Sequence, residues 1–317
     1  MERAIISKIH VVLLPAPAFG HLIPFHQLAV ALANAGVYVS YISTPKNIQR
    51  LPKHSKNVSI NFVSLPLPVL DSNPLTQGAE ATVDVPADQI QYITKAFDLL
   101  RKPLEKFVLE HSPDWLVVDF VSPWATDVGK DCDVPVLGFF PFSAATMLFF
   151  GPPEYLTGDG QKRDRSSLES LTSPPKWDFS HLKNRKKDKS PMSPGSKPSN
   201  GSTNRNPSPS CLLGLGAIET LQFGHCLVVL PLIVDQGLNA RFLVEKGLAI
   251  EVERGEDGSF RRSDIATALR QAMVGKEGEG MRARLRDVAP VVGDREIHDG
   301  YIAGLVEYLK NGAGKQK

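Results

Sequence analysis

The sequence lacks the features that mark secreted, membrane-spanning and nucleic-acid-binding proteins. Its 317 residues include only three cysteines, which have neither a disulfide framework nor metal-ligand spacing. The formal net charge of +2 is too small to indicate binding to nucleic acid or to a membrane. The mostly apolar run Ile9–Leu14 is too short for a signal sequence or a membrane span. We therefore expect a soluble, cytoplasmic monomer.

The first half of the chain instead shows a repeated alternation of strand and helix patterns. The patterns predict short strands at 9–14, 37–42, 58–65, 115–118 and 134–140, and helices at 23–35, within 86–111 and around 143–150. Such alternation is typical of a parallel α/β sheet. The sequence thus predicts a Rossmann-like domain up to about residue 150.

Two residues of this domain could carry acid–base chemistry. His21 follows the first predicted strand, and Asp119 directly follows the strand at 115–118. Because the carboxyl ends of parallel strands meet at one edge of a sheet, both side chains can share a crevice. A histidine oriented by a carboxylate can take a proton from an alcohol or a phenol. Alternatively, each residue has a separate structural partner, the histidine at a helix start and the aspartate at a strand end.

A second α/β pattern lies in the last third of the chain. It predicts a helix at 217–223, strands at 226–230 and 248–252, and helices at 236–246, 263–274, 280–288 and 299–309. Pro290 is expected to break the helix that precedes it. Asp235 and Gln236 follow a buried strand at a helix start, where a polyhydroxyl ligand such as a sugar could be held. Alternatively, Asp235 only caps this helix, and Glu219 only favours the positive end of its own helix.

The stretch Lys183–Ser210 separates the two patterns. Of its 28 residues, seven are Lys or Arg and eighteen are Ser, Pro, Gly or Asn, so it cannot bury enough apolar surface to offset the entropy of ordering. We expect a disordered linker. The basic cluster Lys183–Lys189 could also be read as a nucleic-acid-binding arm, but it has no aromatic side chains to stack on bases, which favours the linker.

The N-terminal motif Gly20-His21-x-x-Pro24 resembles the Gly-His-x-x-Pro of the plant family 1 UDP-sugar glycosyltransferases, which glycosylate secondary metabolites. In that family the histidine is the catalytic base, and an aspartate after a later strand orients it. Asp119 is the position that matches this aspartate. The resemblance therefore implies that His21 and Asp119 are the catalytic pair.

The later motif Glu219-x4-Gly224, followed by Pro231-x3-Asp235-Gln236, resembles the second half of the signature box of that family. The resemblance implies that Glu219 binds the ribose hydroxyls of a UDP-sugar and that Asp235 and Gln236 bind its sugar hydroxyls. The first half of the box, which contacts uracil and the diphosphate, is absent. Where the family has His-Cys-Gly-Trp-Asn-Ser, this chain has the unrelated residues 211–216.

The resemblance implies a GT-B-like α/β fold. It has an N-terminal acceptor-binding Rossmann-like domain at 1–177, a disordered basic Ser/Pro-rich linker at 178–212, and an incomplete, internally truncated UDP-sugar-binding domain at 213–317. It also implies inverting transfer of a hexose from UDP-sugar, a co-substrate, to a hydroxyl of a small lipophilic acceptor, such as a flavonoid, a terpenoid or one of their glycosides. Neither a metal nor another cofactor is expected. Because the diphosphate segment is missing, activity should be impaired. The alternative is a non-catalytic remnant that binds a small molecule or a partner protein.

Overall fold

The computed structural model describes residues 8–70, 75, 77–142, 215–232, 236–255 and 257–313. The chain divides into two compact units, and the C-terminal segment belongs with the first of them. The first unit comprises residues 1–141 and 294–317, and the second comprises residues 142–293.

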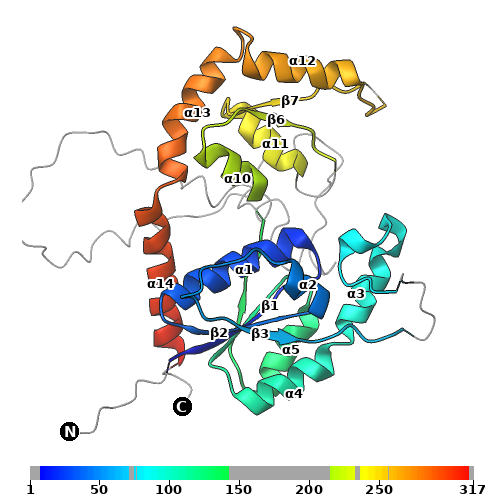
Figure 1. The fold of residues 1–317 in the computed structure, drawn as a ribbon, viewed down its shortest axis with the longest axis vertical. Coiled ribbons are helices and arrows are strands. Elements are labelled where there is room, and N and C mark those ends of the chain that lie inside the picture. Colours follow the sequence, from blue (N-terminus) through cyan, green and yellow to red (C-terminus); the bar gives the residue numbers. More distant parts are fainter. Residues whose placement is uncertain are drawn as a thin grey trace, which may run out of the picture. The chain divides into compact units, whose positions relative to one another are not determined.

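A parallel five-stranded sheet forms the centre of the first unit (Figure 1). Its strands are β1 (His10–Leu14), β2 (Tyr38–Ser43), β3 (Asn61–Ser64), β4 (Trp115–Val118) and β5 (Val136–Gly138). They lie in the order β3-β2-β1-β4-β5, so β1 is central. From β1 the chain forms β2 and β3 on one side and then crosses to form β4 and β5 on the other side. The sheet confirms the prediction of a Rossmann-like α/β unit.

Helices cover both faces of this sheet. They are α1 (Phe19–Asn34), α2 (Pro45–Arg50), η1 (Thr82–Asp84), η2 (Ala87–Gln89), α3 (Ile90–Asp98), α4 (Arg101–His111), α5 (Pro123–Asp131) and α14 (Arg295–Ala313). Successive side chains of a strand point to opposite faces. Val11 and Leu13 accordingly pack with α1 and α14, whereas Val12 and Leu14 pack with α3, α4 and α5. The continuous apolar strand β1 is therefore buried on both sides.

The boundaries of the first helix differ from those expected. Helix α1 begins at Phe19 rather than near Ile23, because the carbonyl of Ala18 accepts hydrogen bonds from the backbone N–H groups of both His21 and Leu22. Pro24 therefore lies inside the helix, where its missing N–H removes one backbone hydrogen bond. His21 consequently belongs to the first helical turn.

The second unit is described in its C-terminal part, which holds two parallel strands and four helices. These are α10 (Leu215–Gln222), β6 (Leu227–Val229), α11 (Gln236–Glu245), β7 (Ala249–Glu251), α12 (Arg262–Met273) and α13 (Glu279–Val292). The expected break at Pro290 is wrong, because α13 continues to Val292. Val292 is fully buried in the core of this unit, so packing favours a continued last turn despite the proline.

Some expectations lie outside the described residues. They are the helix around 143–150, the linker at 178–212 and the residue Asp235. Among the residues that the structure describes, no helix is long and apolar enough to cross a membrane. Cys132 and Cys226 are free thiols.

Candidate active site

The strand order brings His21 and Asp119 together at the carboxyl edge of the sheet. Strands β1 and β4 are direct neighbours, and Leu14 pairs with Val118 at their ends. The residues that follow the two strands therefore leave the sheet side by side. The strand order reverses between β1 and β4, because β2 and β3 lie on one side of β1 and β4 and β5 on the other. Such a topological switch point is where α/β proteins bind ligands.

Asp119 is buried and accepts hydrogen bonds through both carboxylate oxygens. Its Oδ2 accepts from the backbone N–H of Ala16 at 3.1 Å and from Nδ1 of His21 at 2.8 Å, and its Oδ1 accepts from the N–H of Phe120 at 2.8 Å. The side chain of Asp119 is fully buried, whereas that of His21 keeps 17% of its surface exposed. The carboxylate is thus fixed from three directions, and the imidazole reaches solvent.

The partner of Nδ1 determines the tautomer of His21. An ionised carboxylate can only accept hydrogen bonds, so Nδ1 carries the ring proton that points to Asp119. In the neutral imidazole the lone pair then lies on Nε2. This is the arrangement of a histidine general base that is oriented by a carboxylate.

Two aromatic side chains beside His21 escaped the analysis of the sequence. The ring of Phe120 lies 5.7 Å from the ring of His21, and the ring of Phe140 meets Phe120 edge-on at 6.4 Å. Both remain partly exposed, Phe120 at 45% and Phe140 at 39%. Their positions directly after Asp119 and shortly after β5 place them at the carboxyl edge, which is the signal that could have found them. They give the site an apolar wall.

The residues expected to bind a donor sugar lie in the second unit. Glu219 is exposed in the middle of α10, and α10 has no acidic residue in its first turn. The alternative that Glu219 stabilises the start of its helix is therefore not supported. Gln236 is the first residue of α11, and its Oε1 accepts a hydrogen bond from the N–H of Leu232 at 2.8 Å. Asp235 lies outside the described residues, so the three side chains stay predictions as a site.

The described part of the chain holds no cluster of three or more His, Cys, Asp or Glu side chains able to hold a metal ion. The His21–Asp119 pair at the carboxyl edge of the first sheet is therefore considered as a site without a metal ion. Its components suit proton transfer to or from a ligand that lies against Phe120.

The sequence is similar to curated plant enzymes. It is 41% identical over 170 residues to UDP-glycosyltransferase 91C1 of Arabidopsis thaliana, an alignment that covers 53% of this chain and only 36% of that relative. It is 25% identical over 454 residues to soyasaponin III rhamnosyltransferase of Glycine max, with 96% of each chain covered. No family model matches the chain.

Solved plant glycosyltransferases share the fold. The structure of Arabidopsis thaliana UGT89C1 complexed with UDP superposes with a TM-score of 0.64 at 17% identity, covering 96% of this chain and 100% of that chain. The same protein complexed with quercetin gives a TM-score of 0.63 at 18% identity, with the same coverage. Together, these comparisons show that the chain is similar in sequence to plant UDP-glycosyltransferases and shares the fold of solved members of that group.

Proposed function

We propose that this chain is a UDP-sugar-dependent glycosyltransferase of plant secondary metabolism by descent, whose donor site is impaired by an internal truncation. The observation that carries the proposal is the 2.8 Å contact between Nδ1 of His21 and Oδ2 of the buried Asp119, next to an exposed aromatic wall. The similarity to enzymes that are named as glycosyltransferases supports the reaction class.

In the proposed reaction, Nε2 of His21 takes the proton of an acceptor hydroxyl. The oxygen then attacks the anomeric carbon of the UDP-sugar, the bond to UDP breaks, and the configuration at that carbon inverts. Asp119 stabilises the imidazolium that forms, because its carboxylate remains hydrogen-bonded to Nδ1. Phe120 and Phe140 would contact a small lipophilic acceptor, such as a flavonoid or a terpenoid.

The donor half of the reaction is the weak part. Charge developing on the leaving diphosphate must meet preorganised donors, and losing one such donor typically costs a factor of about 10² to 10³ in rate. The sequence lacks the motif that would contact the diphosphate. The truncation is supported by the alignment with the soybean enzyme, which extends over 454 residues although this chain has 317. We therefore propose slow transfer at best.

Calorimetric titration of the whole chain with UDP tests the donor site. Saturable binding that is weakened by Glu219→Ala and unaffected by His21→Ala would support a nucleotide site in the second unit. The transfer assay should then show that His21→Ala lowers kcat by about 10²- to 10⁴-fold, as expected for loss of a general base. Absence of UDP binding to the folded chain would contradict the proposed glycosyltransferase activity. It would favour a non-catalytic remnant that binds a small molecule or a partner protein.

A further inference from the structure

The short loop that leads into the helical turn of His21 is held on two sides. Residues 15–18 connect β1 to α1, and the N–H of Ala16 donates to Oδ2 of Asp119 at 3.1 Å. On the other side, the carbonyl of Pro17 accepts a hydrogen bond from the N–H of Thr82 at 2.9 Å. Thr82 is the first residue of η1, a segment distant in sequence from both β1 and β4. The position of His21 thus depends on what holds η1.

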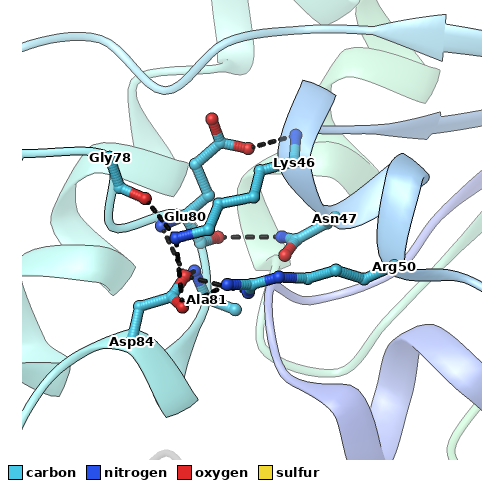
Figure 2. A network of polar contacts seen from close by, with 7 residues as sticks. All are labelled: Lys46, Asn47, Arg50, Gly78, Glu80, Ala81 and Asp84. Carbon is cyan, nitrogen blue, oxygen red and sulfur yellow. Dashed lines mark hydrogen bonds and ion pairs between the residues drawn. The ribbon is translucent and has the colours of Figure 1, made fainter.

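Asp84, at the end of η1, is the centre of an ionic network with helix α2 (Figure 2). Its two carboxylate oxygens accept hydrogen bonds from both terminal nitrogens of Arg50, at 2.7 and 3.1 Å. The ammonium group of Lys46 lies 3.3 Å from Oδ1 of Asp84. Oδ2 also accepts from the backbone N–H groups of Glu80 and Ala81, each at 3.0 Å. This paired, forked geometry is the strong form of an arginine–carboxylate contact.

Further contacts bind the same two segments to each other. The N–H of Lys46 donates to Oε2 of Glu80 at 2.7 Å, and its ammonium donates to the carbonyl of Gly78 at 2.6 Å (Figure 2). Nδ2 of the fully buried Asn47 donates to the carbonyl of Glu80 at 2.8 Å. Helix α2 therefore holds the whole turn 78–84, not only one carboxylate.

The network stays charged at any pH suitable for an assay. The side chain of Asp84 is only 10% exposed. Burial opposes its ionisation, but the hydrogen bonds from Arg50, from the backbone of Glu80 and Ala81 and from Lys46 outweigh burial and hold the pKa of Asp84 well below its usual range. The hydrogen bond to Asp84, together with the negative charges of Asp84 and Glu80, raises the pKa of Arg50.

Arg50 provides a second path to the catalytic loop. Its guanidinium lies over the ring of Phe19, with its central carbon 5.8 Å from the ring centre. Phe19 is the first residue of α1 and precedes His21 by two positions. Asp84 is thus linked to Pro17 of the loop through the hydrogen bond of Thr82, and Arg50 contacts Phe19 of α1 directly.

We propose that Asp84 is a positioning residue, which sets the first turn of α1 and thereby the imidazole of His21 through the Thr82–Pro17 hydrogen bond and the Arg50–Phe19 contact. The inference rests on the proposed role of His21 as the general base. A displacement of a reacting group by about 1 Å can cost a factor of about 10² in rate, so the anchoring of this loop has catalytic consequences.

Asp84→Asn tests the proposal, because asparagine keeps the size of the side chain but removes the charge. The matched control is Asp131→Asn, which removes an exposed ion pair, at 3.2 Å, between the end of α5 and Arg101 at the start of α4. We expect kcat to fall about 10- to 100-fold in Asp84→Asn, with unchanged affinity for UDP and an unchanged pH profile. The control should leave kcat unchanged.

Two measurements do not require turnover. Hydrogen exchange of the backbone amides at 16–22 should become about tenfold faster in Asp84→Asn, the change expected from losing a hydrogen bond to a charged group. The NMR signal of the Nδ1 proton of His21 should shift or broaden. Neither should change in the control. If Asp84→Asn does not fold, Arg50→Lys keeps the charge, loses the forked contact and should show a smaller effect on the same residues.

The outcomes distinguish the positioning role of Asp84 from the proposed function of the chain. Unchanged exchange at 16–22 and an unchanged His21 signal in folded Asp84→Asn would overturn the positioning role, whatever the activity. Altered His21 signals in a chain that transfers no sugar even as wild type would support the positioning role and contradict the proposed function.

Discussion

Tyr41 is the bulkiest of the fully buried side chains in the described residues, and its hydroxyl is a polar group that the core of the first unit has to accommodate. It donates a hydrogen bond of 2.8 Å to the carbonyl of Leu22, in the turn of α1 that follows His21. Burial, with a smaller contribution from the charge of Asp119, raises the pKa of Tyr41 far above its usual value of 10.0. The hydroxyl therefore stays protonated and remains a donor.

Removing this hydroxyl should destabilise the fold. Tyr41→Phe loses one buried hydrogen bond, and we expect the free energy of unfolding to fall by about 1 kcal/mol. The matched control is Tyr38→Phe on the same strand, where the side chain is 43% exposed, with an expected change within about 0.5 kcal/mol. Urea denaturation followed by tryptophan fluorescence measures both. Equal effects of the two substitutions would contradict the assigned role of the Tyr41 hydroxyl.

The pH dependence of stability should reflect two buried histidines. Burial is the main cause that lowers the pKa of His10 and of His26 below 6.5, and the neighbouring His54 adds to the effect at His26. Below about pH 6.5 the unfolded chain therefore binds protons that the folded chain does not, so stability falls as the pH falls, and above it these residues have no effect. We expect a lower urea midpoint at about pH 5.5 than at about pH 7.5.

A variant separates the contribution of the histidine pair. Nε2 of His26 lies 3.3 Å from Nδ1 of His54. His54→Gln removes the neighbouring imidazole that helps to lower the pKa of His26, so the loss of stability between the two pH values should become smaller. A urea midpoint that is equal at both pH values in the wild type would contradict the lowered pKa values of His10 and His26. NMR titration of the ring protons measures these two pKa values directly.

The candidate site was partly predictable from single residues. His21 and Asp119 could be found because each follows a buried strand, and parallel strands end at the same edge. Phe120 and Phe140 could not be ranked as site residues, because their exposure depends on the packing of loops around them. The ionic partners Asp84 and Arg50 belong to segments whose closeness arises only from the tertiary fold.

At the scale of elements, the sequence pattern identified helices better than their ends. Gly36 and Gly247 follow α1 and α11 in the left-handed region, which glycine adopts without strain. The expected break at Pro290 was wrong, since Pro290, like Pro24, lies inside a helix. Each proline removes one backbone hydrogen bond, and packing of the buried neighbouring residues outweighs that local cost.

Helix α14 offers a matched pair of glycine substitutions. A Cβ atom at Gly304 meets no atom within 4 Å, whereas a Cβ atom at Gly312 would overlap the ring of Trp115. That ring is fixed, because its Nε1 donates to the carbonyl of Leu309 at 3.0 Å. Gly304→Ala should stabilise the protein by about 0.5–1 kcal/mol through better helix propensity, and Gly312→Ala should destabilise it.

Thermal unfolding measures the two variants against the wild type. Because both substitutions replace glycine by alanine in the same helix, a destabilisation seen only in Gly312→Ala reports the overlap with Trp115. Similar stabilisation by both would mean that the end of α14 does not pack on β4, contrary to the structure.

At the scale of the whole molecule, the proposed acceptor and donor residues belong to different compact units. His21, Asp119 and Phe120 lie in the first, and Glu219 and Gln236 in the second. The sequence could predict a parallel α/β class for the first unit from its alternation of strands and helices. It could not predict the order β3-β2-β1-β4-β5, because strand order is set by which faces pack together over long range.

This division predicts that acceptor binding does not depend on the donor site. Quercetin is a flavonoid, one of the acceptor classes of the proposed function, and is therefore a suitable probe. We expect the whole chain to bind quercetin in calorimetric titration with the same affinity with and without UDP. Phe120→Ala should weaken binding by about 2- to 10-fold, the equivalent of one aromatic contact. Tyr301→Ala, which truncates another exposed ring of the first unit, should have no effect.

The ligands that the chain binds show whether the acceptor site, the donor site or both are functional. Binding of quercetin with no binding of UDP would mean that the acceptor unit works without the donor unit, as expected if the missing diphosphate segment abolished only the nucleotide site. Quercetin binding that requires UDP would instead show that the second unit completes the acceptor site, and the independence of the two units would be wrong. An unchanged affinity in Phe120→Ala would remove the aromatic wall from the site and leave the His21–Asp119 pair without an identified acceptor surface.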